Sequence, residues 1–263
     1  MNQNAKGTNT ESFRGRNAGS ELTSEPSGGV NPSGLFIAIE GGDGSGKGTQ
    51  SKLLAEYARQ EGYDVLEISF PRYGNDSAYY VEQYLNGAYG GTNDVPADLG
   101  VLPYAIDRYA ASVEIRAHLA KPNSLVIADR YMASNLAHQG AKIADANERT
   151  LFYERTKTTE YGVLGIPRPD KNIVLVVPTN LMQENVDKKA TRSYTANKRD
   201  IHEADADHLE KAKANFEELC ELFPSEFTAL HCTDQKGSLH PIETIQLKLR
   251  ELTNLHATQP GRS

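Results

Sequence analysis

A glycine-rich stretch with a single lysine is the strongest candidate for chemistry in this chain of 263 residues. The stretch reads Gly41, Gly42, Asp43, Gly44, Ser45, Gly46, Lys47, Gly48 and Thr49. It satisfies the pattern G-x-x-x-x-G-K, whose glycines let the backbone fold around phosphate oxygens and point several N–H groups inward. The lysine would add a point charge for the outer phosphates of a nucleotide. The stretch therefore predicts a loop that binds ATP or a related triphosphate.

The loop departs from the common pattern in one place that concerns the metal ion. The hydroxyl residue that usually follows the lysine comes one position later, because Gly48 precedes Thr49. Mg²⁺ often keeps several waters and binds through substrate phosphates. We expect Mg²⁺ to accompany ATP, and the candidate side-chain ligands are Thr49, Asp129 and Glu203.

Three arginines are candidates for a second anion site that would face the first. Arg72 and Arg130 each follow an expected strand, and Arg108 lies in an expected long helix. The planar fork of arginine suits a phosphate group, although an arginine alone is more often part of a surface salt bridge. Arg130 is the exception, because it forms an acidic–basic pair with Asp129 at the end of a buried apolar strand. Asp129, directly before Arg130, is placed to orient Lys47 or a water bound to Mg²⁺.

A run of basic residues late in the chain is a candidate lid at about 187–200. The run contains Lys188, Lys189, Arg192, Lys198 and Arg199. A charge run is usually a solvated face. An enzyme that transfers a phosphoryl group from ATP to a second anionic substrate, however, needs a cover that excludes water, since otherwise ATP would be hydrolysed instead.

These residues must be positioned by elements that alternate along the chain. Strand candidates occupy 35–40, 64–70, 124–129, 172–177 and 227–231. The first, third and fourth are nearly continuous apolar runs, which is typical of strands buried on both faces of a parallel sheet. Helical patterns occupy 49–60, 96–120, 145–160 and 204–222. The alternation predicts an α/β fold with a five-stranded parallel sheet flanked by helices on both faces. Ligands should then bind at the carboxyl ends of the strands.

The two ends of the chain read differently from its middle. Residues 1–33 are rich in Asn, Ser, Thr and Gly, so they cannot bury enough apolar surface to offset their chain entropy. We expect a disordered tail there and another at 256–263, with one catalytic domain at 34–255.

Composition narrows the class of partner. The net charge of −7 argues against nucleic acid. No apolar run approaches the ~20 residues that would span a membrane, and the N-terminus lacks the ~7–15 apolar residues of a secretory signal. The two cysteines fit no metal or redox spacing, which favours reduced thiols in a cytoplasmic protein.

From residue 35 to about residue 222 the sequence resembles the thymidylate kinase family. Matching motifs, in the family's order, are Glu40–Gly44, the FPRYG run at 70–74, Ile106-Asp107-Arg108, Asp129–Asn135 followed by Gln139-Gly140-Ala141, and the PRPD run at 167–170. The resemblance implies the architecture of phosphate-loop nucleotide kinases and a phosphoryl transfer from ATP-Mg²⁺ to thymidine monophosphate (dTMP). It also implies a homodimer.

The resemblance further assigns roles in the acceptor site. Arg72, Arg108 and Arg130 would hold the acceptor phosphate, with Arg130 close to the transferred group. Asp43 would lie near the sugar 3′-hydroxyl, and Phe70 belongs to the site through the FPRYG run.

The resemblance also assigns three residues to the base and one to the sugar. Tyr104 would stack on thymine from the helix that carries Arg108, while Asn135 and Gln139 would contact the base edge or bracket the base. His138 stands where the family usually has an aromatic that crowds the 2′ position and favours deoxyribose, and this chain departs from the family pattern there.

The lid assignment also follows from the resemblance. Some family members carry a catalytic arginine in the phosphate loop, and this chain has glycine or serine there, so Arg192 and Arg199 in the lid are the candidates. The sequence does not choose between them, and Glu203 could orient the acceptor or the metal.

Other classes of nucleotide-binding protein remain as alternatives. The string at 197–200 matches the guanine-reading N-K-x-D of GTPases, but no buried strand precedes it. Another nucleoside-monophosphate kinase, or a catalytically silent nucleotide-binding protein, would be separated from a dTMP kinase by a panel of acceptor monophosphates.

Overall fold

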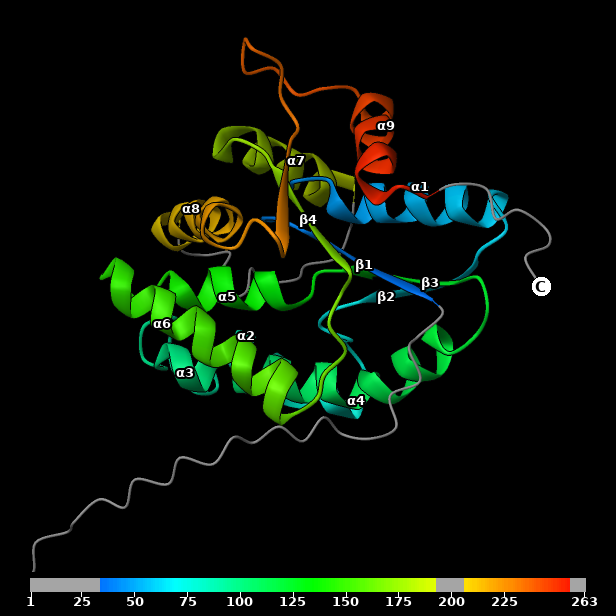
Figure 1. Ribbon diagram of the computed structural model, residues 1–263. Coiled ribbons are helices and arrows are strands. Elements are labelled where there is room, and N and C mark those ends of the chain that lie inside the picture. Colours follow the sequence, from blue (N-terminus) through cyan, green and yellow to red (C-terminus); the bar gives the residue numbers. More distant parts are fainter. Residues whose placement is uncertain (1–33, 193–205, 256–263) are drawn as a thin grey trace, which may run out of the picture. The chain divides into compact units, whose positions relative to one another are not determined.

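A computed structural model describes residues 34–192 and 206–255. It contains a parallel sheet of five strands in the order β2-β3-β1-β4-β5 (Figure 1). The strands are β1 Leu35–Glu40, β2 Asp64–Ser69, β3 Ser124–Asp129, β4 Lys171–Val176 and β5 Phe227–His231. The predicted five-stranded parallel sheet is therefore confirmed, and three of its strands begin and end at the expected residues.

The helices of the described residues surround this sheet. They are α1 Lys47–Gln60, α2 Tyr79–Leu85, α3 Ala97–Gly100, α4 Leu102–Leu119, α5 Met132–Gly140, α6 Ala146–Lys157, α7 Thr179–Arg192, α8 Ala206–Leu222 and α9 Ile242–Thr253. A 3₁₀ turn, η1, spans Asp76–Ala78, and a π-helix, η2, spans Thr158–Val163. The helix expected at 96–120 is divided into α3 and α4, and the one expected at 145–160 becomes α6 followed by η2.

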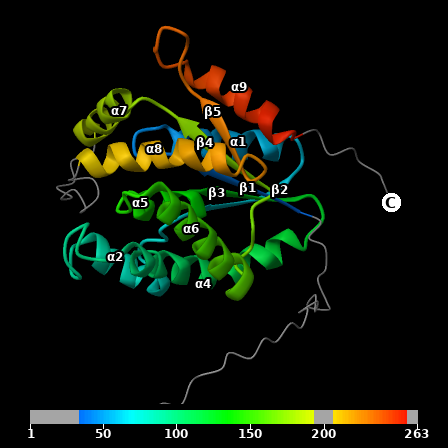
Figure 2. The same cartoon turned by 60° about the vertical axis from the view of Figure 1, so that its left-hand side comes forward.

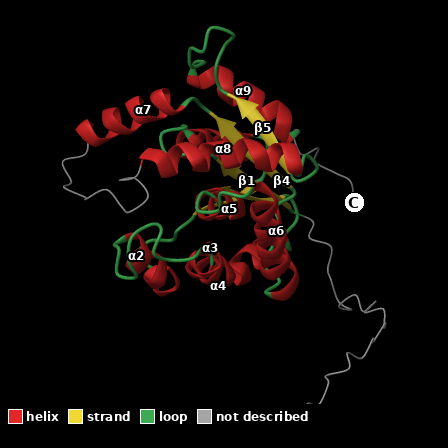
Figure 3. Cartoon of the chain, turned by 90° about the vertical axis from the view of Figure 1, so that its left-hand side faces the viewer, coloured by secondary structure: helices red, strands yellow, loops and turns green. Residues whose placement is uncertain are grey.

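Helices cover both faces of the sheet, as the alternation predicted. Successive side chains of a strand point to opposite faces. Phe36 and Ala38 of β1 belong to a core shared with α4, α5, α6 and α8. Ile37 and Ile39 belong to a second core shared with α1, α7 and α9. Figure 2 shows α9 and α1 on one side of the strands and α4 and α6 on the other, and Figure 3 shows the same layers from a further angle.

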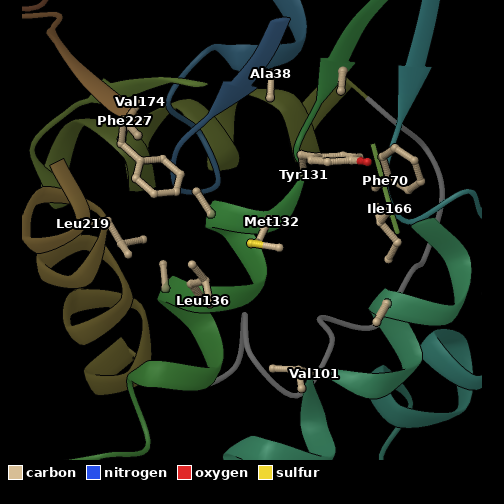
Figure 4. Close-up of a cluster of buried hydrophobic side chains, with 14 of the residues drawn as sticks. Ala38, Phe70, Val101, Tyr131, Met132, Leu136, Ile166, Val174, Leu219 and Phe227 are labelled. Carbon is tan, nitrogen blue, oxygen red and sulfur yellow. The ribbon is translucent and has the colours of Figure 1, made fainter. Parts of the chain in front are cut away.

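Helix α5 is buried along almost its whole length. Met132 and Leu136 are fully buried in the core, near Leu219 of α8 and Val101 (Figure 4). Close packing of this kind holds side chains in fixed rotamers. The polar residues that α5 carries are therefore held in defined positions.

The neighbouring strands β1 and β3 send their chains to opposite faces of the sheet. The two strands pair in parallel, with Ile39 opposite Asp129. After β1 the chain enters α1 on one face, whereas after β3 it enters α5 on the other. This is a topological switch point, where open α/β sheets form a crevice at the carboxyl ends of the strands.

Some of the predicted segments fall outside the described residues. These are the predicted tails at 1–33 and 256–263 and the part of the predicted lid from residue 193 onward, which includes Arg199. Glu203, a predicted metal ligand, also lies outside the described residues. Helix α7 continues to Arg192, so the predicted lid begins inside this helix. Within the described ranges, no helix combines the length and apolarity that crossing a bilayer requires.

Candidate active site

The glycine-rich loop connects β1 to α1 at the switch point. Gly46 adopts a left-handed conformation with φ of 90° and precedes the first residue of α1, Lys47. The N–H groups at the start of α1 therefore face the loop, as in other anion sites at helix N-termini. Sequence and structure agree on the strand–loop–helix arrangement that the G-x-x-x-x-G-K pattern requires.

Helix α7 lies against the loop at Gly44. A Cβ atom at Gly44 would be 2.1 Å from the carbonyl oxygen of Met182, and its φ is 83°. The side-chain amide of Asn185 donates to the Gly44 carbonyl at 2.9 Å. Only glycine fits here, because a side chain would collide with the backbone of α7.

Lys47 is buried at the base of the loop. Its ammonium donates to the Gly42 carbonyl at 3.1 Å and lies 3.5 Å from the Asp43 carboxylate. Burial, assisted by the nearby guanidinium of Arg130, lowers the pKa of Lys47 to about 8. The ammonium is thus held at the loop by a carbonyl and a carboxylate.

Arg130 joins the loop to the strand beside it. It follows β3 with a φ of 67°, a left-handed conformation that is uncommon for a residue with a side chain. Its guanidinium pairs with the Asp43 carboxylate and donates to the Gly41 carbonyl at 3.4 Å. The pKa of Asp43 is well below its usual range, mainly because of this guanidinium. The structure therefore brings Asp43, Lys47 and Arg130 together.

Asp129 lies beside the start of α1. A Cβ atom on Gly48 would lie only 3.0 Å from Oδ2 of Asp129. The close carboxylate therefore favours glycine at the position after Lys47. Its Oδ1 atom is buried and has no hydrogen-bond partner within the described ranges. A buried carboxylate oxygen at the phosphate loop fits a divalent cation. Thr49, the third residue of α1, is exposed.

A buried carboxylate ties the end of β1 to the start of α5. Glu40 is fully buried and accepts from the backbone N–H groups of Tyr131, Ala133 and Ser134 at 2.9, 2.9 and 3.1 Å, and from the Ser134 hydroxyl at 2.6 Å. Burial raises the pKa of Glu40. This carboxylate fixes α5, and hence the residues α5 carries, relative to the loop.

A cavity of about 290 Å³ opens beside the loop. This volume is at the lower end of the range for small-molecule sites. Of the predicted acceptor residues, its wall contains Asp43, Phe70, Tyr104, Arg108, Arg130, Asn135, His138 and Gln139. The ring of Phe70 lies edge-on to that of Tyr131, with 5.4 Å between the ring centres (Figure 4). The ring centres of His138 and His208 are 5.6 Å apart.

One part of the cavity wall rests on a buried ion pair. Arg108 and Glu160 are each 1% exposed, and Nε and Nη2 of the arginine donate to the two carboxylate oxygens at 2.8 and 2.6 Å. Asn135 donates to the same carboxylate at 3.2 Å. Glu160 belongs to the π-helix η2, a type of element that is frequent at functional sites.

Arg72 is placed differently from the other two arginines. Its guanidinium donates to Asp107 at 2.9 Å and to the Ser77 hydroxyl at 2.8 Å, and the residue does not belong to the cavity wall. Its role at the acceptor phosphate stays a prediction.

The fold and the site together define a class of protein. A phosphate loop at a switch point, next to a cavity whose wall includes Arg108 and Arg130, is the arrangement of a phosphate-loop nucleotide kinase. The fold is that of solved thymidylate kinases, from Candida albicans (TM-score 0.59, 20% identity, 84% of this chain and 91% of that one) and from Ehrlichia chaffeensis (TM-score 0.57, 20% identity, 84% of this chain and all of that one).

Sequence comparison gives the family. The model of the thymidylate kinase family matches residues 39–241. A thymidylate kinase of Mycobacterium tuberculosis is 33% identical over 188 residues, which cover 70% of this chain and 85% of that protein. The chain belongs to the thymidylate kinase family, as the resemblance of its motifs implied.

Sequence reasoning missed several residues that build the site. Glu40 was noticed only as part of a motif, although an acidic residue at the end of a buried apolar strand is a usable signal. Glu160 carried no such signal, because its partner Arg108 is 52 residues away in the sequence.

Proposed function

We propose that this chain transfers a phosphoryl group from ATP, bound at the loop Gly41–Thr49, to dTMP, bound in the neighbouring cavity. Family membership makes it a thymidylate kinase, an enzyme that phosphorylates dTMP with ATP as donor. The observation that carries the two-site proposal is the position of Arg130, which contacts the loop carbonyl of Gly41 and also lines the cavity. A guanidinium at this junction would face the group that passes from one nucleotide to the other.

Catalysis would come from alignment and from neutralised charge, since phosphoryl transfer needs little covalent participation by the protein. Lys47 would exchange its contact with the Gly42 carbonyl for donor phosphates. Positioning two substrates can contribute roughly 7–11 kcal/mol.

Mg²⁺ is the proposed cofactor. Asp129 would hold it or one of its waters, and the ion would neutralise charge on the donor phosphates. Within the described ranges no cluster of three acidic, histidine or cysteine side chains exists, so phosphates and water would supply the other ligands. Thr49 and Glu203 stay candidates, as do Arg192 and Arg199 for the lid.

The contacts suggest how dTMP would lie in the cavity. Asp43 and Arg130 mark the end next to the phosphate loop, so we assign this end to the acceptor phosphate and sugar. Arg108 shares the Glu160 carboxylate with Asn135, which was assigned to the base edge. We therefore propose that Arg108 belongs to the base end rather than to the phosphate, and that Tyr104 stacks on the ring.

A second copy of the chain is the proposed partner of α4. Leu102, Ile106, Tyr109 and Val113 repeat at helical spacing and are 43–71% exposed. Such a stripe on one face of a helix is suited to pairing with another helix. In sedimentation experiments we expect a dimer that Val113→Glu shifts towards monomer, and a wild-type monomer would contradict the proposal.

We also propose a cytoplasmic location, which the two free cysteines, Cys220 and Cys232, support.

The reaction is tested with a panel of acceptors. The purified chain would be given ATP-Mg²⁺ and each of dTMP, dUMP, dCMP, dGMP, UMP and AMP, while ADP release is followed. We expect dTMP to give the highest kcat/KM. Preference for another monophosphate, or ADP release equal to that without acceptor, would refute the proposed reaction. A Lys47→Met variant controls for contaminating kinases.

A further inference from the structure

Two buried amide side chains of α5 each leave one atom without a hydrogen-bond partner. Gln139 is fully buried and Asn135 is 3% exposed, and both belong to the cavity wall. The atoms without a partner among the described residues are Nε2 of Gln139 and Oδ1 of Asn135. Buried polar atoms are nearly always satisfied, so such a pair in a cavity wall indicates a ligand. The two residues are spaced i, i+4 and lie on one face of the helix.

The orientation of Asn135 follows from its partners. Its Nδ2 atom donates to the Val101 carbonyl at 3.2 Å and to the Glu160 carboxylate at 3.2 Å. Both partners are acceptors, so the nitrogen must face them. The oxygen of Asn135 is therefore an acceptor available to the cavity.

The orientation of Gln139 is set through a relay of two residues. Lys142 donates to the Tyr84 hydroxyl at 2.8 Å and to the Val95 carbonyl at 2.8 Å. An ammonium group only donates, so the Tyr84 oxygen accepts from Lys142, and its own proton goes to Oε1 of Gln139 at 3.4 Å. In this arrangement the oxygen of Gln139 faces Tyr84, and its nitrogen is left as a donor.

The surroundings hold this relay in place. A Cβ on Gly100 would lie 2.1 Å from Oε1 of Gln139 and 3.3 Å from the Lys142 nitrogen, so the backbone of α3 closes the space behind both. The Lys142 nitrogen also lies 5.3 Å from the centre of the Tyr84 ring. Burial lowers the pKa of Lys142 to about 8, which still leaves the amine mostly protonated at pH 7.

We infer that Lys142, acting through Tyr84, is a positioning residue that fixes Gln139 as a donor beside the acceptor Asn135. A donor next to an acceptor matches the edge of a 4-oxopyrimidine, which offers a carbonyl and an N–H. The same pair mismatches a 4-aminopyrimidine, whose amino group would face the donor Gln139 and whose ring nitrogen would face the acceptor Asn135. Lys142 would thus help to select thymine over cytosine without touching either. This inference rests on the proposed placement of the base in the cavity.

The test compares selectivity among matched variants. Lys142→Met and Tyr84→Phe each interrupt the relay, Lys142→Arg keeps a cationic donor, and Lys121→Met removes an exposed lysine that pairs with Asp64 away from the site. For each protein, kcat/KM is measured with dTMP and dCMP, together with the KM for ATP and the melting temperature.

We expect Lys142→Met and Tyr84→Phe to lower the ratio of kcat/KM for dTMP over dCMP by about tenfold, the weight of one hydrogen bond. The double variant should show the same ratio as either single variant, because both residues act in one relay. Lys142→Arg should recover most of the ratio, and the KM for ATP should not change.

A substrate analogue provides a second readout. In 4-thio-dTMP the sulfur accepts hydrogen bonds only weakly, so wild type should prefer dTMP over the analogue, and Lys142→Met should lose most of that preference.

If Lys142→Met and Tyr84→Phe leave the ratio of kcat/KM for dTMP over dCMP unchanged, this inference is overturned, while the proposed reaction still stands. If Lys142→Met does not fold, Tyr84→Phe decides, since it keeps the aromatic ring. Failure of the wild-type protein to phosphorylate dTMP would instead overturn the proposed reaction and this inference with it.

Discussion

The buried pair Arg108–Glu160 allows a sharp prediction that separates stability from substrate binding. Arg108→Met would remove the guanidinium and leave the Glu160 carboxylate at 1% exposure, with Asn135 as its one remaining side-chain donor among the residues that the structure describes. Removing one partner of a buried ion pair costs about 3–5 kcal/mol, because the other charge stays buried without compensation. For a chain of this size the melting temperature should fall by roughly 6–20 °C, at ~2–4 °C per kcal/mol.

The double variant Arg108→Met/Glu160→Met supplies the other half of the experiment. It buries no charge, and replacing a buried pair by apolar residues is often neutral or stabilising by about 1–4 kcal/mol. We therefore expect the double variant to be more stable than Arg108→Met, while kcat/KM for dTMP remains low in both. Urea unfolding gives the free energies of unfolding, and the acceptor assay gives the activity.

An exposed pair serves as the matched control. Arg155 and Asp98 are 56% and 62% exposed, so Arg155→Met should change stability by only about 0–1 kcal/mol. The reasoning would be refuted if Arg108→Met behaved like this control. It would equally be refuted if the double variant were destabilised by the sum of the two single changes.

Further predictions concern the phosphate loop and its neighbours. Lys47→Ala should lower kcat at least ~100-fold, about 2.7 kcal/mol in the barrier, and near-normal turnover would contradict its assignment. The pKa of Lys47 is about 8 in the free protein, and bound phosphates would raise it towards its ordinary 10.5. Binding of ATP should therefore take up a proton between about pH 8 and 10, so that the Kd rises with pH in this window by up to tenfold per unit. Calorimetry in buffers of different ionisation enthalpy measures this uptake, and a Kd that stays constant up to pH 10 would exclude it. Arg130→Ala should abolish transfer while ATP binding, measured by fluorescence titration, is largely kept; an equal loss of both would indicate a structural role.

The strands were predictable because a strand that is buried on both faces of a sheet has a continuous run of apolar residues in the sequence. The apolar runs of β1 and β3 are continuous, and both strands have the expected bounds. The division between α3 and α4 was not predicted, since the pattern at 96–120 stays helical through Gly100 and α4 begins again just before Pro103. The nine-residue helix α5 was read as a motif rather than as an element, because polar residues interrupt its apolar pattern.

The site was predictable only where its residues are contiguous in sequence. The spacing of glycines and lysine from Gly41 to Thr49 is sufficient to predict the phosphate loop. The sequence could not reveal that Arg72 and Arg108 are bound by acidic partners 35 and 52 residues away, because pairing over such separations depends on the tertiary fold. Which arginines face the cavity is therefore a property of packing and not of pattern.

The contact between Gly44 and α7 also limits how such a chain can change over evolution. No side chain can be introduced at Gly44 while the backbone of Met182 stays where it is. A descendant that gained a long cationic group at this position would first have to shift α7 and give up the bond from Asn185. The order of mutations is thus restricted: the helix must move before the loop can diversify, and intermediates that reverse the order would fold poorly.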